Sequence, residues 1–398
     1  MKGFDVTGAV GAVGEEIIAW RRHLHAHPEL GYEEVETAAF VARLLRGFGL
    51  EVVEGVGGTG VLALLQGEAG GEGRCVALRA DMDALPVTEE TNLPFASRYP
   101  GKMHACGHDG HTAMLLGVAK VLSLHRQDFA GTVKFFFQPA EECAPEGGAK
   151  GMIAAGVMEN PKVDYVFALH VWPELPLGKV GVKTGALMSA SDRVRIRIQG
   201  KGGHGAAPHQ AVDAVVVACQ VVSALQTVVS RQVDPLEPVV LTIGSIHAGQ
   251  RYNVIAPTAE LDGTVRTQNE ALRSALPSRI TKLAQATAEA FGAEAEVNYE
   301  FGYPTLYNHP RAVEVVRSAV TEVLGEEALV EMARPSMGGE DFAYFLDLAN
   351  GAMFWLGCRS PRTPDAPIHN GKFDFDEDAL AVGSRVMVQA ALNALKEV

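Results

Sequence analysis

The densest polar cluster in the chain lies at residues 104–111, where three histidines and one cysteine occur within eight residues: His104, Cys106, His108 and His111. Imidazole and thiolate groups are typical ligands of zinc, manganese and related ions. A structural zinc knuckle would need a second Cys or His pair at matching spacing, and the sequence has none. Redox chemistry at Cys106 would need a nearby partner cysteine. The cluster therefore indicates a functional metal site, with a helix-capping loop as the alternative.

Two adjacent carboxylates, Glu141 and Glu142, follow the apolar run 132–137. If the chain is extended there, the two side chains point in opposite directions. One carboxylate can then bind a metal while the other acts as a general base, which is the division of labour in metal-assisted hydrolysis. Ordinary surface glutamates are the alternative, but the position after an apolar strand favours the catalytic interpretation.

Polar side chains also follow two other expected strands. Asp81 and Asp83 come after the apolar run 75–80, and His170 comes after 165–169. Functional groups gather beyond the carboxyl ends of parallel strands, so this placement suggests a shared site. A turn-capping aspartate and an ordinary core histidine remain open alternatives. His369, in a loop, carries no signal of its own.

Three further segments offer possible substrate contacts. His204 lies among the glycines of 202–205, which permit close approach of a ligand or form a plain strand-to-helix connection. Asn253 places an amide in a loop. Gly338 and Gly339 precede an expected helix, whose free backbone amides would suit a substrate carboxylate. An ordinary helix entry is the alternative there.

Helical and strand-like segments alternate before residue 185. Helical spacing is seen at 15–25, 34–48 and 111–124, and short apolar runs occur at 60–65, 75–80, 132–137 and 165–169. Strands separated by helices predict an α/β domain, with a mostly parallel central sheet and helices on both faces.

The pattern changes at residues 186–295. Its segments follow the order strand, helix, strand, strand, helix, strand, at 194–198, 212–230, 239–246, 259–267, 272–291 and 295–299. This order is typical of a ferredoxin-like α+β unit. We therefore expect an inserted lid or dimerisation domain at 186–295, with residues 1–185 and 296–398 forming the catalytic metal-binding domain and a terminal helix starting near Asp376.

Composition narrows the class of protein. The chain has 398 residues and a formal net charge of -14, which argues against nucleic acid as a partner. No apolar run approaches the ~18 residues of a membrane span, and the N-terminus lacks the features of a signal peptide. Five scattered cysteines do not suggest a disulfide framework. These features predict a cytoplasmic protein that acts on small molecules.

Taken together, the polar segments resemble the metal-dependent amidohydrolase family that includes hippurate hydrolases and auxin-conjugate hydrolases. This family is a branch of the aminoacylase and carboxypeptidase-like metallopeptidases, with a zinc-peptidase-like catalytic fold. The resemblance covers nearly the whole chain. It rests on the segments HLHAHPEL (23–30), RADMDALP (79–86), HACGHDGH (104–111), QPAEE (138–142), GHGAAPH (203–209) and NVI (253–255).

The resemblance implies a role for each polar residue. Two divalent ions per subunit, zinc or manganese with cobalt and nickel as further candidates, would be bound by Cys106, His108, Glu142, His170 and His369. Cys106 would bridge the ions and Glu141 would be the general base, while His204 and Asn253 would polarise the substrate carbonyl. In the wider superfamily a histidine stands where this chain has Asp81. We therefore expect Asp83 to orient a ligand rather than bind metal.

The implied activity is hydrolysis of the amide bond of N-acyl amino acids, such as N-acetyl or N-benzoyl compounds, to a carboxylic acid and a free amino acid. A dipeptidase or carboxypeptidase on the same scaffold is one alternative. A non-catalytic ligand-binding protein is another. The resemblance also implies a homodimer or homotetramer in which His204 acts within its own subunit or across the interface.

Overall fold

The computed structural model describes residues 4–70 and 73–397, which fold into two compact units. The first unit comprises Met1–Leu187, Tyr307–Pro335 and Asp341–Val398. The second comprises Met188–Leu306 and Ser336–Glu340. The expected insertion of 186–295 covers most of the second unit. The unit extends further because the last strand of its sheet continues beyond residue 295.

The first unit is built on an eight-stranded sheet. Its order is β1 (Glu51–Val56), β2 (Gly60–Gln66), β4 (Thr132–Gln138), β3 (Cys75–Asp81), β5 (Tyr165–Pro176), β16 (Asn350–Arg359), β6 (Val180–Val182) and β15 (Leu329–Glu331). The four central strands β4, β3, β5 and β16 run parallel, and antiparallel pairs flank them. The mostly parallel α/β sheet predicted from the sequence is thus confirmed.

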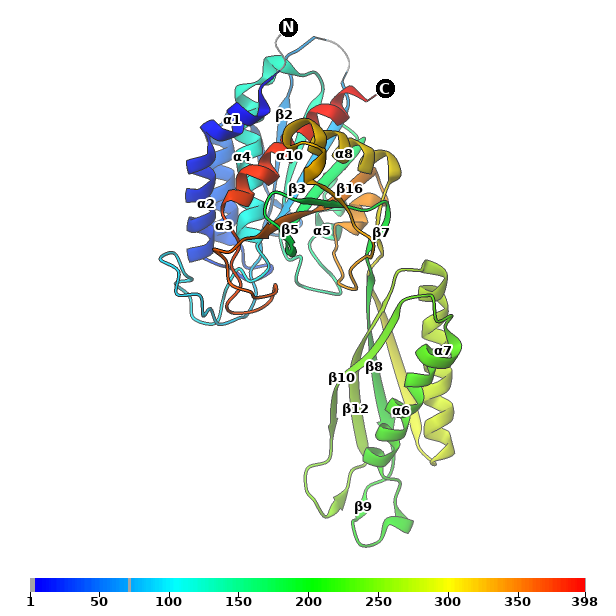
Figure 1. The fold of residues 1–398 in the computed structure, drawn as a ribbon. Helices are drawn as coiled ribbons and strands as arrows, with labels where there is room; N and C mark the ends of the chain where they lie inside the picture. The colour runs from blue at the N-terminus through cyan, green and yellow to red at the C-terminus, as the bar shows by residue number, and fades with distance from the viewer. Residues whose placement is uncertain (1–3, 71–72, 398) are drawn as a thin grey trace. The chain divides into compact units, whose positions relative to one another are not determined.

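Helices cover both faces of this sheet, because alternate side chains of its strands point to opposite sides. Phe135 and Phe137 join the main core, whereas Phe136 packs on Phe345, with ring centroids 5.5 Å apart. The main core lies under helices that pack on one another (Figure 1): α1 (Val6–Ala12), α2 (Gly14–Ala26), α3 (Val35–Gly47), α4 (His108–Leu124), α8 (Pro310–Leu324) and α10 (Asp378–Lys396). Two short helices, α5 (Ala149–Ala154) and α9 (Ala343–Leu346), contact each other on the opposite side.

The second unit has a four-stranded antiparallel sheet and two long helices (Figure 1). Along the chain these are β8 (Ala190–Gln199), α6 (Ala214–Gln232), β10 (Val239–Ala248), β12 (Thr258–Thr267), α7 (Glu270–Ala290) and β13 (Glu294–Tyr303). The sheet order is β10, β12, β8, β13, which is the ferredoxin-like arrangement that the sequence predicted. Small two-stranded ribbons pair β9 (Gly203–His204) with β11 (Val254–Ile255) and β7 (Gly185–Met188) with β14 (Leu306–Asn308).

Helix α6 corrects one expectation from the sequence. By length and composition alone it could cross a membrane, although no such segment was expected. Its buried residues recur every three or four positions, as in a helix with one apolar face: Ala214, Val217, Ala218, Val221, Leu225 and Val228. That face packs on β10, β12 and α7. The helix therefore has a place in the core of the second unit.

Candidate active site

Two groups of candidate metal ligands meet at Cys106. One group is Cys106, His108 and His170, all buried, and the other is Cys106, Glu142 and His369. Within each group the ligand atoms all lie within 4.8 Å of one another. A third group with the same spacing joins Glu141 to His108 and Glu142. The fold therefore brings together every residue that the sequence assigned to metal binding, together with the expected base.

The start of helix α4 places Cys106 and His108. Between them Gly107 has φ 88°, a left-handed conformation that favours glycine. A Cβ atom there would lie 2.4 Å from Cγ2 of Val171, so the close contact with β5 also requires glycine. Helix α4 begins at His108 rather than at the expected residue 111. The cysteine and the histidine are thus held at a tight turn against the neighbouring strand.

His170 lies inside strand β5 rather than at its end. The strand was expected to stop near residue 169, but it continues to Pro176. The reason is that β16 remains paired with it, so that His170 lies opposite Trp355. The Nδ1 atom of His170 donates to the carbonyl of Val171 at 2.7 Å. This leaves Nε2 directed at Sγ of Cys106, 3.4 Å away.

The extended chain on which the opposite orientation of Glu141 and Glu142 depended is not present. Strand β4 ends at Gln138, and Ala140 has φ 55°, so the backbone turns instead of remaining extended. The turn is held by buried carboxylates: Ala140 N–H donates to Glu34 and Glu142 N–H donates to Asp83, at 2.8 and 2.9 Å. With this turn, a carboxylate oxygen of each glutamate lies within 4.8 Å of a ring nitrogen of His108 and of the other glutamate's oxygen.

Asp83 contacts two of the candidate ligands. Its Oδ1 atom lies 3.2 Å from Nδ1 of His108, and its Oδ2 accepts the Glu142 amide. With Nδ1 engaged, the Nε2 atom of His108 is buried and has no hydrogen-bond partner among the described residues. A buried ring nitrogen without a hydrogen-bond partner is consistent with a position that binds a metal ion. The arrangement of Asp83 is that of a group that orients ligands.

The electrostatics of the cluster favour a cation. Burial opposes a charge on His108, but the carboxylates of Asp81, Asp83 and Glu142 outweigh burial and raise its pKa to about 10. Burial, with Glu142 and Glu141, holds the pKa of the Cys106 thiol well above its usual range. A bound cation would reverse that effect, because metal coordination stabilises a thiolate. The donor set of one thiol, three imidazoles and carboxylates suits zinc and related ions.

His111 and Asp81 lie beside the cluster, but their polar atoms are already engaged. Nδ1 of His111 lies 2.7 Å from Asp81, and its Nε2 accepts the Val171 amide at 3.0 Å. The second oxygen of Asp81 binds the guanidinium of Arg79 at 2.7 Å. These two residues form a further group of possible ligands with His108, but their hydrogen bonds to Arg79 and Val171 already hold them in place.

Arg79 belongs to a buried network that sequence reasoning missed. Besides Asp81 it contacts Gln138 at 2.9 Å and Asp341 at 3.1 Å. Gln138 also donates to Asp341, at 2.8 Å. Burial raises the pKa of Asp341 to about 6, although Arg79 opposes the rise. The available signal was the spacing of Arg79 and Asp81, which puts both on one face of β3.

The predicted substrate-binding residues His204 and Asn253 lie in the second unit. The ribbon of β9 and β11 brings them together, since Gly205 N–H donates to the Asn253 carbonyl at 2.9 Å. Ala206 N–H donates to Nδ1 of His204 at 3.0 Å. A neutral imidazole that accepts at Nδ1 carries its proton on Nε2, and this side chain is exposed. His204 can therefore act as a hydrogen-bond donor.

Gly338 and Gly339 do not begin a helix, contrary to expectation. Helix α9 starts only at Ala343 and has four residues. The amide of Gly338 is occupied, because it donates to Oγ of Ser336 at 3.0 Å. Gly339 packs against Ser191, where an added Cβ would lie 2.6 Å from the serine Cβ. Close packing within the second unit thus accounts for these glycines.

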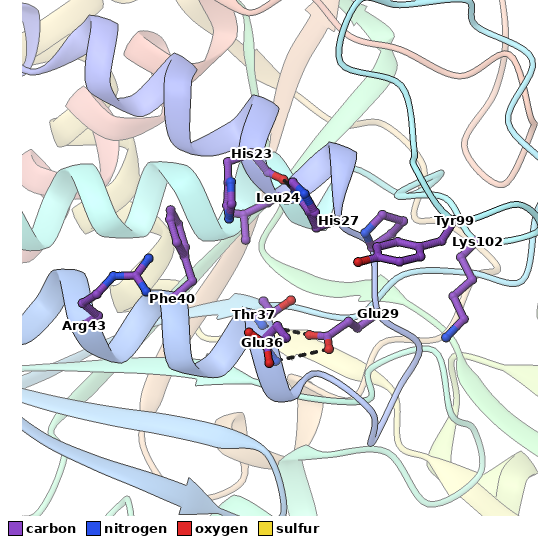
Figure 2. A pocket seen from close by; sticks show the side chains of 11 residues that line it. His23, Leu24, His27, Glu29, Glu36, Thr37, Phe40, Arg43, Tyr99 and Lys102 are labelled. Carbon is purple, nitrogen blue, oxygen red and sulfur yellow. Dashed lines mark hydrogen bonds between the residues drawn. The ribbon is translucent and has the colours of Figure 1, made fainter.

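A separate cavity of about 610 Å³ lies between α2 and α3 (Figure 2). His23 and His27 line it from α2, and Phe40 and Arg43 line it from α3. Both nitrogens of His27 are engaged, with the His23 carbonyl at 2.7 Å and Arg98 at 3.3 Å. None of the predicted site residues lines this cavity. The candidate active site is instead the cluster around Cys106.

Comparison with known proteins decides the family. Residues 77–393 match the model of peptidase family M20/M25/M40. The chain belongs to this family. It is 49% identical over 305 residues to an N-acyl-L-amino acid amidohydrolase of Geobacillus stearothermophilus, covering 77% of this chain and 81% of the relative. It is 41% identical to thermostable carboxypeptidase 1 of Saccharolobus solfataricus, with 94% of each chain covered.

A solved structure agrees with this assignment. A dinuclear metal-binding peptidase of family M20 from Bacillus subtilis superposes with a TM-score of 0.84 at 37% identity, covering 98% of this chain and all of that one. The resemblance seen in the sequence is thereby confirmed. The present chain is therefore a metal-dependent hydrolase that cleaves amide bonds. The alternative of a non-catalytic ligand-binding protein is set aside.

Proposed function

We propose that this M20 family member holds two divalent ions and hydrolyses the amide bond of N-acyl amino acids. The observation that carries the metal proposal is the position of Cys106, which is shared by two compact ligand groups. Cys106, His108 and His170 would hold one ion, and Cys106, Glu142 and His369 the other. Zinc and manganese suit these donors best, with cobalt and nickel as further candidates.

When bound, the ions would supply Lewis acidity to the attacking water and to the substrate carbonyl. Glu141 is assigned the proton transfers: it takes a proton from the attacking water and later delivers it to the departing amide nitrogen. The Nε2–H of His204 would donate a hydrogen bond to the carbonyl oxygen as negative charge develops there, assisted by Asn253. Gly339 remains the candidate for contact with the substrate carboxylate.

N-acyl amino acids are the proposed substrates because a 49% identical relative carries the name N-acyl-L-amino acid amidohydrolase. We expect N-acetyl and N-benzoyl amino acids to be hydrolysed with kcat/KM at least about 10-fold above that of unblocked dipeptides, a difference of roughly 1.4 kcal/mol in transition-state binding. Steady-state rates on matched pairs with the same carboxyl-terminal residue measure this difference. A preference for the unblocked dipeptides would reject the proposal.

A carboxypeptidase activity is the second candidate, supported by the name of the Saccharolobus solfataricus relative. N-blocked dipeptides separate the two activities. A carboxypeptidase releases the last residue of a blocked dipeptide, whereas an enzyme restricted to small acyl groups leaves it intact. We expect slower cleavage of N-blocked dipeptides than of N-acetyl amino acids.

We also propose that the protein works in the cytoplasm as a homodimer or homotetramer through the second unit. Sedimentation should show at least a dimer, and a fully active monomer would contradict this. If His204 acts across the interface, mixing His204→Ala chains with Glu141→Ala chains should restore activity, because one site of the mixed dimer has both residues. Recovery up to about a quarter of wild-type activity is expected for random pairing, and each variant alone is the control.

A further inference from the structure

The buried Arg21 of helix α2 contacts acidic side chains from two segments that are distant in the sequence. Its Nε atom lies 2.9 Å from Oδ2 of Asp109, and its Nη2 atom lies 2.7 Å from Oδ1 of Asp374. The Nη1 atom also reaches Glu377 at 3.3 Å. Only 1% of the Arg21 side chain is exposed. One buried guanidinium therefore joins the buried Asp109 to the partly buried Asp374 and Glu377.

These carboxylates adjoin the candidate metal ligands. Asp109 follows His108 in the first turn of α4, and Asp374 lies five residues after His369. The same two segments also meet through their backbones, because His369 N–H donates to the Ala105 carbonyl at 2.7 Å. Arg21 thus provides a second connection between the segment with Cys106 and His108 and the segment with His369.

The orientation of the guanidinium is fixed on several sides. The rings of Phe375 and Phe95 lie 4.4 and 4.9 Å from its central carbon. His25, one turn later on α2, places Nδ1 2.8 Å from the same Asp109 oxygen. A planar group with five donors can hold Asp109 and Asp374 at once, whereas a lysine ammonium lacks that fork. These contacts therefore fix how far the segment with Asp374 lies from the start of α4, and in which direction.

We propose that Arg21 is a positioning residue, which sets the His369 segment against the start of α4 so that both ligand groups can close on their ions. The inference rests on the proposed two-metal site. Among the described residues, Arg21 hydrogen-bonds to Asp109, Asp374 and Glu377, none of which is a proposed metal ligand. It belongs to α2, whose sequence contributed to the family resemblance but had no role in the predicted chemistry.

The test is metal affinity in Arg21→Lys and Arg21→Met, measured by competition with a chromophoric chelator. Arg22→Met is the matched control, because the neighbouring Arg22 is half exposed and shares Glu377 and Phe95 with Arg21, but among the described residues makes no hydrogen bond to Asp109 or Asp374. Groups that orient metal ligands typically change affinity 10- to 100-fold when removed. We expect the more weakly held ion to bind at least about 10-fold less tightly in both Arg21 variants, and Arg22→Met to match wild type.

Further measurements separate positioning from a loss of stability. Val316→Ala, on the buried face of α8, should lower the melting temperature without changing metal affinity. The absorption bands of the cobalt-loaded protein should shift in Arg21→Lys but not in Val316→Ala. With saturating metal, kcat of Arg21→Lys should recover while KM stays near wild type.

Unchanged affinity for both ions in Arg21→Lys would overturn the positioning role, as would an equal loss of metal in Val316→Ala. A wild-type protein that binds no metal would instead overturn the proposed function, and this inference with it. Arg21→Lys keeps the test decisive if Arg21→Met does not fold, because it retains the buried charge.

Discussion

Replacing Glu141 with glutamine should lower turnover by about 10²-fold or more, the usual scale for removing a general base. The variant should keep both ions and a near-normal KM, because glutamine preserves the size and hydrogen bonding of the side chain. Elemental analysis and steady-state kinetics measure the two effects separately. Near-normal turnover in Glu141→Gln would show that another group is the base.

Glu142 provides the contrast, since the two glutamates have identical chemistry and neighbouring positions. His369 Nε2 lies 3.0 Å from Oε1 of Glu142, which places the latter among the proposed ligands. Glu142→Ala should therefore lose at least one bound ion together with activity. If Glu141→Ala lost metal and Glu142→Ala did not, the two roles would be exchanged.

Removal of divalent ions should abolish hydrolysis, and zinc or manganese should restore it. The physical reason is that Glu141 alone cannot generate a sufficiently reactive nucleophile from water at neutral pH. Metal uptake should also release protons. Without a cation, burial and the nearby glutamates keep the pKa of Cys106 above its usual range, so the thiol is protonated before binding and deprotonated after it.

Two measurements check this prediction. Activity is followed during chelation and stepwise restoration of metal, and proton release is followed in weakly buffered solution with an indicator dye. Cys106→Ser is a suitable comparison, because it should release fewer protons and bind metal more weakly. Full activity in protein shown by elemental analysis to be metal-free would refute the mechanism.

The sequence by itself determined the fold class, and its resemblance to a family supplied the proposed metal ligands. Alternating apolar runs and amphipathic segments specified a parallel sheet, because strands buried on both faces must be continuously apolar. The ligand types at 104–111 and 138–142 pointed to metal-assisted chemistry. His369 was assigned to the metal site only through the family resemblance, because nothing in the sequence of its loop indicates a metal ligand.

Other features were decided only by the tertiary structure. The turn at Ala140 precedes two glutamates that both lie close to His108, and strand pairing beyond His170 lengthens β5. His108 and His111 lie in the same polar cluster, but of these two only His108 has a ring nitrogen with no hydrogen-bond partner among the described residues, because the Val171 amide donates to Nε2 of His111. Local periodicity cannot show which backbone groups from distant segments reach a side chain. Arg21 joins segments more than 80 residues away for the same reason, so its role becomes visible only when those segments are packed together.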